Sequence, residues 1–497
     1  MNHDRFPAPR RPADQKFQNQ VHGSNTLRRF LILLLFALTA AKIGAILARG
    51  PVSIENDAYG YWRLSSLVLS GDPFLLGEPI AYRTPIYPWF VALIRKLSDA
   101  PLLTIVIVQG VLALASIAIA ALIAGRATNQ PRAVLLTWAT ALPAFSAFVF
   151  SAAVLSETLF IFLVMLNLLA VSNYAKQETI GRAICVGISF ALALLTKPIV
   201  LLLWIPHLVF LIHSYVRKRK RFGRRVVRKT KLRHCLGHLG IAFVAVMLIV
   251  SPWLLRNQSL FGHPFITEFL GRNIWIVTFQ DGSGAGLMMP DNQDAQELKR
   301  RLANVGASED WQSTWKVSRA LVASGLSDAQ ADRLMKRVAF SADAADLSKS
   351  NYKRVRRIAN FWRCAATDIP IQGGAGNYRG QQIWKINVPF IDWVIEHRWS
   401  QSVWLNTLLA LVTGLATLYL MIEATTRPFG IWIALIFGYF TVVTGVLEIP
   451  DYRYRIVVEP IAAMTIGSAI AMMFAKRRSE TRLPKTTTRQ AKPVAIL

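Results

Sequence analysis

The apolar residues of this chain are gathered into runs of about twenty, and this clustering restricts the possible fold more than any other feature. A helix needs about 20 apolar residues to cross the hydrocarbon core of a bilayer. Backbone groups inside lipid must pair within their own segment, so such runs are expected to form spanning helices. The sequence predicts ten spans, approximately at 29–48, 101–124, 132–151, 155–172, 181–196, 198–215, 236–255, 402–424, 428–447 and 455–475.

The composition excludes the main alternatives to an all-α polytopic membrane protein. Of the 497 residues, 53% are hydrophobic and only 17% are charged, which excludes soluble multidomain, disordered and fibrous proteins. The three cysteines are too few and too scattered for a disulfide framework or a zinc site. The basic run 217–233 is expected to fix the topology and to attract anionic lipid headgroups, so no nucleic-acid partner is predicted.

Positive charge predicts the orientation of the spans. Ten spans place both termini on one side, and the segments on that side are rich in Lys and Arg. The loop 216–235 holds eleven basic residues, and the tail from residue 476 holds seven. Because cytoplasmic loops carry an excess of Lys and Arg, both termini are expected in the cytoplasm. The loops 49–84, 256–400 and 448–454 are then expected to face outward.

This topology divides the chain into a cytoplasmic basic tail (1–28), a transmembrane module (29–255) that contains the first outer loop, an outer domain (256–400), C-terminal transmembrane helices (401–475) and a second basic tail (476–497).

Two outer segments are expected to be helical. In the first outer loop, apolar positions on one face of residues 57–70 predict a helix in the membrane interface, with Tyr61 and Trp62 at headgroup level. The apolar piece 86–97 is expected to be re-entrant or interfacial. Leu, Val and Met at three- and four-residue spacing predict helices over 290–365, so the outer domain is expected to be small and mostly helical.

Ionisable residues at the outer ends of the spans are functional candidates, because charge near lipid is expensive to bury. Cations among them could hold a phosphate and carboxylates could take a proton, which suits group transfer from a lipid phosphate. Any single member could instead be an interfacial charge that forms an ion pair; their accumulation on one side is the stronger signal. They are Glu55, Asp57, Arg83, Glu157, Lys197, Arg256, Glu448, Asp451, Arg453 and Arg455.

Short motifs around these residues follow one another in a recognisable order. They are Asp57-Ala-Tyr59, Gly71-Asp72-Pro73-Phe74, Arg83-x-Pro85-x-Tyr87-Pro88, Ser156-Glu157-Thr158, Thr196-Lys197-Pro198, Ser251-Pro252-Trp253-x-x-Arg256-Asn257 and Asp451-Tyr452-Arg453-Tyr454-Arg455. Their order and sidedness resemble the C-type glycosyltransferase superfamily. Within it, the resemblance is to the bacterial branch related to protein O-mannosyltransferases and to lipid A aminoarabinose and galacturonic acid transferases. It covers roughly residues 29–275 and 402–475.

The resemblance implies that the transmembrane module 29–255 is catalytic. The implied enzyme is a hexosyl- or pentosyltransferase that moves a sugar from a polyprenyl-phosphate donor to a hydroxyl on a lipid, glycan or protein at the outer face of a bacterial inner membrane. Asp57 matches the family's first-loop acid, which implies a general base and inversion at the anomeric carbon. Relatives often have two adjacent acids there, and here Asn56 separates Glu55 from Asp57, so Glu55 is a second candidate. Glu157 could orient the acceptor, support a metal or pair with Arg83.

The resemblance also implies a set of donor-binding residues. Arg83 lies where relatives place a basic residue that contacts the donor phosphate. No cofactor is predicted, and no outward loop carries His, Asp and Glu at metal-ligand spacing. The residues expected to bind the donor phosphate or sugar are Arg83, Arg453, Arg455, Lys197, Arg256, Tyr59 and Tyr87.

Three other functions remain open on the residues alone. They are a flippase or transporter of lipid-linked sugars, a polymerase or ligase of lipid-linked saccharides, and a non-catalytic scaffold. Transporters more often show internal repeats and charged or broken helices at the membrane midplane. Here no repeat is visible and the ionisable residues gather at the outer surface, which favours the transferase. The residues name neither the sugar nor the acceptor.

Overall fold

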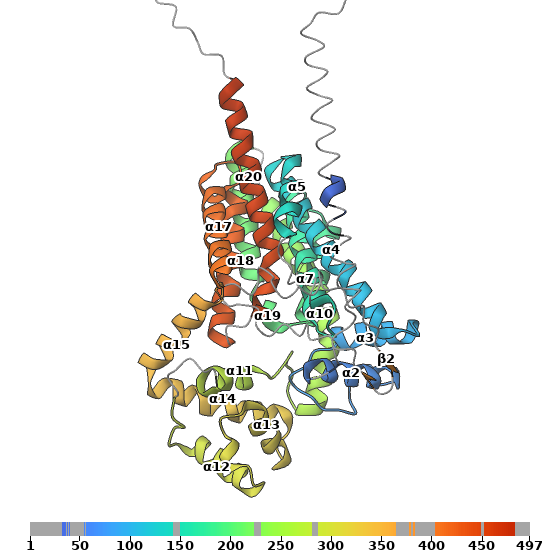
Figure 1. Ribbon diagram of the computed structural model, residues 1–497, viewed down its shortest axis with the longest axis vertical. Helices are drawn as coiled ribbons and strands as arrows, with labels where there is room; N and C mark the ends of the chain where they lie inside the picture. Colours follow the sequence, from blue (N-terminus) through green and yellow to red (C-terminus); the bar gives the residue numbers. More distant parts are fainter. Residues whose placement is uncertain are drawn as a thin grey trace, which may run out of the picture.

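The computed structural model describes residues 32–35, 37, 39, 54, 56–142, 150–222, 230–280, 287–363, 377–378, 381–382, 403–448 and 452–482. Figure 1 shows a bundle of long helices with a smaller helical unit below one end. Seven described segments are long and apolar enough to cross a membrane. The predicted class, an all-α polytopic membrane protein, is therefore confirmed.

The bundle consists of α4 (Pro101–Thr128), α5 (Pro131–Ala141), α7 (Glu157–Lys176), α8 (Ile180–Leu194), α9 (Trp204–Phe222), α10 (Thr230–Phe261), α17 (Val403–Ile422), α18 (Arg427–Leu447) and α20 (Glu459–Arg482). The predicted count of ten spans is not reached within the described residues. Helix α8 is apolar but has only 15 residues. Helix α5 ends shortly before residues 143–149, and these lie outside the described part, as does most of the predicted span 29–48.

The predicted break at Lys197-Pro198 is present in the structure. Helix α8 ends at Leu194, and a short 3-10 turn, η1 (Pro198–Val200), precedes α9. A proline disfavours the helical conformation of the residue before it. Lys197 accordingly has an extended backbone, with φ −146° and ψ 116°. The break therefore places this lysine at the end of the bundle rather than inside a helix.

The first outer loop contains two helices, α2 (Asn56–Leu69) and α3 (Ile86–Leu97). Helix α2 confirms the helix predicted over 57–70, and its aromatic residues Tyr61 and Trp62, predicted at headgroup level, are covered by protein. Tyr61 and Trp62 are only 6% and 8% exposed to solvent, because α2 packs its apolar face on α3. The Tyr61 and Tyr87 rings meet edge to face, with centroids 4.7 Å apart. These side chains therefore belong to the protein core.

The unit below the bundle in Figure 1, called the outer unit after the predicted topology, is built from short helices. They are α11 (Leu270–Trp275), a π-helical turn η2 (Ile276–Gln280), α12 (Gln293–Asn304), a 3-10 turn η3 (Ser308–Asp310), α13 (Thr314–Ala323), α14 (Asp328–Ala345) and α15 (Leu347–Asn360). Residues Leu298, Leu321 and Met335 are fully buried in a core of its own. The helices predicted over 290–365 are confirmed. Two two-residue strands, β1 (Asn377–Tyr378) and β2 (Gln381–Gln382), pair antiparallel.

A buried polar network connects this outer unit to the first outer loop. Arg272 is fully buried and pairs with Asp328 and Asp332 of α14. The Asp328 carboxylate accepts a 2.7 Å hydrogen bond from the Ala81 backbone N–H. The Ala81 carbonyl in turn accepts a 2.9 Å bond from the Glu268 backbone N–H. The loop that carries Arg83 is therefore attached to the outer unit two residues before the arginine.

Replacing Gly271 with Ala is expected to destabilise this attachment. An added Cβ would lie 1.8 Å from the Asp332 carbonyl oxygen, so α11 and α14 must move apart. Overpacking of this kind typically destabilises a protein by roughly 1–3 kcal/mol. The measurement is the midpoint of thermal unfolding in detergent. Gly240→Ala in α10 is the control, because its Cβ meets nothing within 4 Å. Equal midpoints for the two variants would contradict the prediction.

Candidate active site

Five of the predicted residues form one chain of ion pairs, the site cluster, at the end of the bundle that faces the outer unit. Arg83 donates to one oxygen of Asp57 (Nη2 to Oδ1, 2.6 Å). Arg453 donates to the other (Nη1 to Oδ2, 2.8 Å), and its Nε donates to Glu157. Lys197 Nζ donates to the same Glu157 oxygen at 2.7 Å. The order is Arg83, Asp57, Arg453, Glu157 and Lys197.

Three members of the site cluster lie in the first turn of a helix or on a short helix. Asp57 is in the first turn of α2, and Glu157 is the first residue of α7. A carboxylate at such a position is stabilised by the positive end of the helix dipole. Arg453 is on the four-residue helix α19 (Tyr452–Arg455) that precedes α20. Helix ends from distant parts of the chain therefore supply the charges.

The segments that carry Arg83 and Lys197 are hydrogen-bonded to each other. The Thr84 hydroxyl donates to the Thr196 carbonyl at 3.1 Å, and the Ile86 N–H donates to the Leu195 carbonyl at 3.3 Å. The Arg83 guanidinium also lies over the Tyr61 ring, 4.3 Å from its centroid. These contacts fix the first outer loop against the α8–α9 connection.

The charges of the site cluster suit a single anion. Burial acts to raise the pKa of Asp57, but Arg83 and Arg453 outweigh it and hold that pKa well below its usual range. Asp57 is therefore ionised at neutral pH. Three cations and two carboxylates leave a formal charge of +1. The Asp57 side chain is still 35% exposed, whereas that of Glu157 is 1% exposed. One oxygen of Glu157, Oε2, is buried with no hydrogen-bond partner among the described residues.

Two predicted cations lie outside the site cluster and bind protein groups instead. Arg256 on α10 donates to four carbonyls of the first outer loop, those of Leu75 (2.8 Å), Ile80 (2.9 Å), Phe74 (3.0 Å) and Glu78 (3.3 Å). Arg455 is buried and donates to the Trp362 carbonyl and the Asn406 side chain, both at 2.8 Å. Arg256 therefore positions the loop that carries Arg83, and Arg455 anchors the start of α20.

The predicted tyrosines are not brought into the site cluster either. Tyr87 is buried, and its hydroxyl donates to Gln109 at 3.1 Å. Tyr59 is 42% exposed, because it lies on the opposite face of α2 from Asp57. The second candidate base, Glu55, lies outside the described residues. Among the residues that the structure describes, no group of three His, Cys, Asp or Glu side chains could hold a metal ion.

One residue near the site cluster belongs to none of the sequence motifs. Glu448 follows the last residue of α18, and its Oε1 accepts a 3.0 Å hydrogen bond from Asn273 Nδ2 of the outer unit. It also interacts with Lys197, Arg453 and Tyr454. Its position directly after a span is the only sequence signal that distinguishes it, and Asn273 has none.

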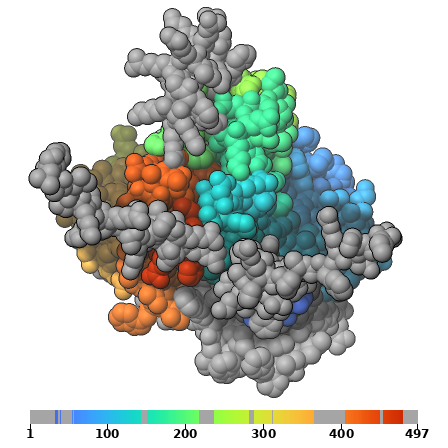
Figure 2. Space-filling view, turned by 90° about the horizontal axis from the view of Figure 1, so that it is seen from above, coloured from blue at the N-terminus to red at the C-terminus, as the bar shows by residue number. Residues whose placement is uncertain are grey.

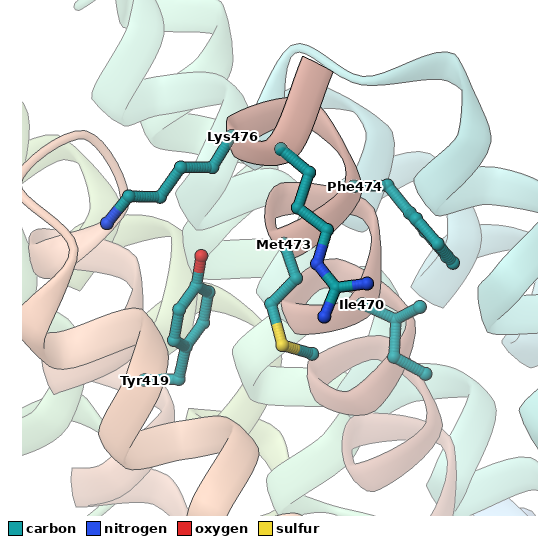
Figure 3. A pocket seen from close by; sticks show the side chains of 6 residues that line it. Tyr419, Ile470, Met473, Phe474 and Lys476 are labelled. Carbon is teal, nitrogen blue, oxygen red and sulfur yellow. The ribbon is translucent and has the colours of Figure 1, made fainter. Parts of the chain in front are cut away.

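A cavity of about 350 Å³ lies at the opposite end of the bundle, between α17 and α20. Figure 2 views this end, where α20 lies beside α17 and α5. Figure 3 shows Tyr419, Met473 and Lys476 among the side chains that line the cavity. It shares no residue with the site cluster and is not part of the site.

One segment of the chain matches a known protein family. Residues 82–255 match the dolichyl-phosphate-mannose-protein mannosyltransferase family, and this segment contains Arg83, Glu157 and Lys197. No curated protein sequence matches the chain.

Two crystal structures of ArnT from Cupriavidus metallidurans are similar, each at 12% sequence identity. The structure bound to undecaprenyl phosphate has a TM-score of 0.36 and covers 94% of this chain and 83% of that chain. The apo structure has a TM-score of 0.33 and covers 90% and 78%. The resemblance predicted from the motifs is confirmed over residues 82–255, which match a family of membrane glycosyltransferases, the dolichyl-phosphate-mannose-protein mannosyltransferases.

Proposed function

We propose that the protein transfers a sugar from a polyprenyl-phosphate donor to a hydroxyl group at the outer face of a bacterial inner membrane. The observation that carries this proposal is the pairing of Asp57 with two guanidinium groups in a cluster of formal charge +1. A polyprenyl-phosphate sugar is a phosphodiester with one negative charge. Arginine binds phosphate oxygens with paired hydrogen bonds, so Arg83 and Arg453 are suited to the donor phosphate.

Donor binding would also activate Asp57. The donor phosphate competes with the carboxylate for Arg83 and Arg453, which now hold the Asp57 pKa low. Once these arginines turn to the phosphate, burial dominates and the pKa of Asp57 rises. A carboxylate with a higher pKa is a stronger base. Asp57 would therefore become an effective base only when the donor is in place, which limits hydrolysis of the donor by water.

The transfer is a single displacement. The acceptor oxygen attacks the anomeric carbon, the bond from that carbon to the phosphate oxygen breaks, and the configuration inverts. The acceptor proton goes to Asp57, and the polyprenyl phosphate leaves with the bonding electron pair. Arg83, Arg453 and Lys197 stabilise the charge that develops on the phosphate. Glu157 positions Arg453 and Lys197 through its two ion pairs.

The distribution of charge supports outward orientation of the site. Helix α20 runs from the end of the bundle that carries α19 to the opposite end, where Lys476 and Arg477 lie (Figure 1). Basic residues favour the cytoplasmic side. The site cluster would then face outward and both termini would be cytoplasmic. The partners would be a polyprenyl-phosphate-linked sugar, a hydroxyl-bearing lipid, glycan or protein, and anionic lipids at the cytoplasmic basic loop.

The test is transfer from a panel of polyprenyl-phosphate sugars in vesicles of known protein orientation. We expect one donor to be consumed, and the product to have the inverted anomeric configuration, only when the donor is on the side of the outer unit. Consumption from the cytoplasmic side would contradict the outward orientation. If no donor is consumed but labelled lipid crosses the bilayer, the protein is a flippase.

A further inference from the structure

We propose that Glu448 and Asn273 form the acceptor subsite and that together they bind two neighbouring hydroxyl groups of a glycan acceptor. This inference rests on the proposed transferase function. It assigns a residue outside the recognised motifs, and it selects a glycan among the three acceptor classes that the site cluster leaves open.

Glu448 lies where three parts of the structure meet. Its backbone N–H donates to the Thr444 carbonyl at 2.8 Å, so the residue is fixed at the end of α18. Asn273 comes from α11 of the outer unit, and Tyr454 comes from α19, next to Arg453. Both side chains hydrogen-bond to the Glu448 carboxylate. A molecule bound at Glu448 would therefore contact the outer unit and lie beside the site cluster.

The hydrogen-bonding capacity at this place is incomplete without a ligand. Asn273 Nδ2 is used by Glu448, but Asn273 Oδ1 is buried with no hydrogen-bond partner among the described residues. A buried carbonyl oxygen without a donor destabilises the protein, so a donor supplied by a ligand would be favourable there. The Asn273 oxygen and the Glu448 carboxylate are both hydrogen-bond acceptors. They lie close together, because the amide nitrogen of the same Asn273 side chain donates to Glu448. Neighbouring hydroxyls on a sugar ring supply two donors at this spacing, whereas a serine or threonine side chain supplies one.

The ionisation of Glu448 should make glycan binding depend on pH. Burial raises the pKa of Glu448 to about 7, although Lys197 and Arg453 and the hydrogen bonds from Tyr454 and Asn273 act to lower it. Arg357 of α15 donates to the carbonyl of Gly445, three residues before Glu448. Below pH 7 the group is protonated and accepts hydrogen bonds less well. Glycan binding should therefore strengthen as the pH rises through about 7.

The experiment compares wild type with Glu448→Gln, using the donor that the vesicle assay identifies and a panel of methyl glycosides and a serine peptide as acceptors. We expect the KM for the glycoside to rise at least tenfold and its pH dependence near 7 to disappear. Binding of polyprenyl phosphate and hydrolysis of the donor by water should not fall, because Lys197 and Arg453 stay in place and lose only a neighbouring negative charge. The control is Glu423→Gln, at the α17–α18 turn, where every parameter should stay at the wild-type value.

A second variant tests the amide independently. Asn273→Leu nearly keeps the shape of the side chain but removes its acceptor oxygen, so we expect the same loss of glycoside affinity with donor hydrolysis retained. An unchanged glycoside KM in both variants would overturn the subsite. So would an equal loss of polyprenyl phosphate binding, because Glu448 would then belong to the donor site. Preferential use of the serine peptide by wild type would overturn the glycan assignment. A wild type that neither transfers nor hydrolyses any donor contradicts the transferase function itself.

Discussion

Sugar transfer by the Asp57→Asn variant is expected to be about 10²- to 10⁴-fold slower than by wild type, the usual contribution of a general base. Asparagine nearly preserves the shape of the side chain and can still accept one hydrogen bond from Arg83 or Arg453. It cannot take the acceptor proton. The measurement is the single-turnover rate of transfer in vesicles, together with binding of polyprenyl phosphate. Binding should persist, because the variant no longer offers a carboxylate that competes with the phosphate for the two arginines.

The control for this variant is Asp99→Asn, which removes an exposed carboxylate from the connection between α3 and α4. Its transfer rate should equal that of wild type. If Asp57→Asn transfers sugar at the wild-type rate, Asp57 is not the base, and Glu55 and Glu157 become the carboxylates to test.

Arg453→Gln is expected to impair both folding and donor binding. Arg453 bridges Asp57 and Glu157, and Glu157 is almost completely buried. Removing one partner of a buried ion pair typically destabilises a protein by about 3–5 kcal/mol. Lys197 still pairs with Glu157, so the lower end of this range is expected. Loss of a phosphate-binding guanidinium should also weaken polyprenyl phosphate binding at least tenfold. The measurements are the thermal unfolding midpoint and the affinity for fluorescent polyprenyl phosphate.

The double variant Arg453→Gln, Glu157→Gln separates the two effects. It removes the buried carboxylate together with its partner, so part of the lost stability should return. Donor binding should not return, because the guanidinium is still missing. Recovery of donor binding in the double variant would show that Arg453 acts only by neutralising Glu157.

Much of the fold could be predicted from the sequence, because lipid and helix geometry impose strong patterns. The long apolar runs predict helices such as α4 and α17, and residue spacing predicts α12 to α15. The environment of an apolar face is harder to predict. The spacing in α2 shows that Tyr61 and Trp62 share an apolar region, but the same spacing suits a membrane interface and a protein core. Only the packing of α3 on α2 decides between them.

The candidate site was predictable as a set of charges but not as a set of pairs. The predicted topology places the same five residues at one end of the bundle: Asp57, Arg83, Glu157, Lys197 and Arg453. The predicted option of a pair between Glu157 and Arg83 is not observed; Glu157 pairs with Arg453 and Lys197 instead. Helix periodicity explains other differences. Residues two apart on a helix point to nearly opposite faces, which separates Arg455 from Arg453 and Tyr59 from Asp57.

The hydrogen bonds of the first outer loop have a consequence for the entropy of donor binding. Arg256 holds residues 74–80, the outer unit holds Ala81, and the α8–α9 connection holds Thr84. Arg83 therefore projects from a backbone that is already ordered. Immobilising a flexible side chain on binding typically costs about 0.5–1.5 kcal/mol, and ordering a loop adds to this. In this protein the loop is ordered during folding, so the polyprenyl phosphate gains its contacts with Arg83 without having to order the segment that supplies them.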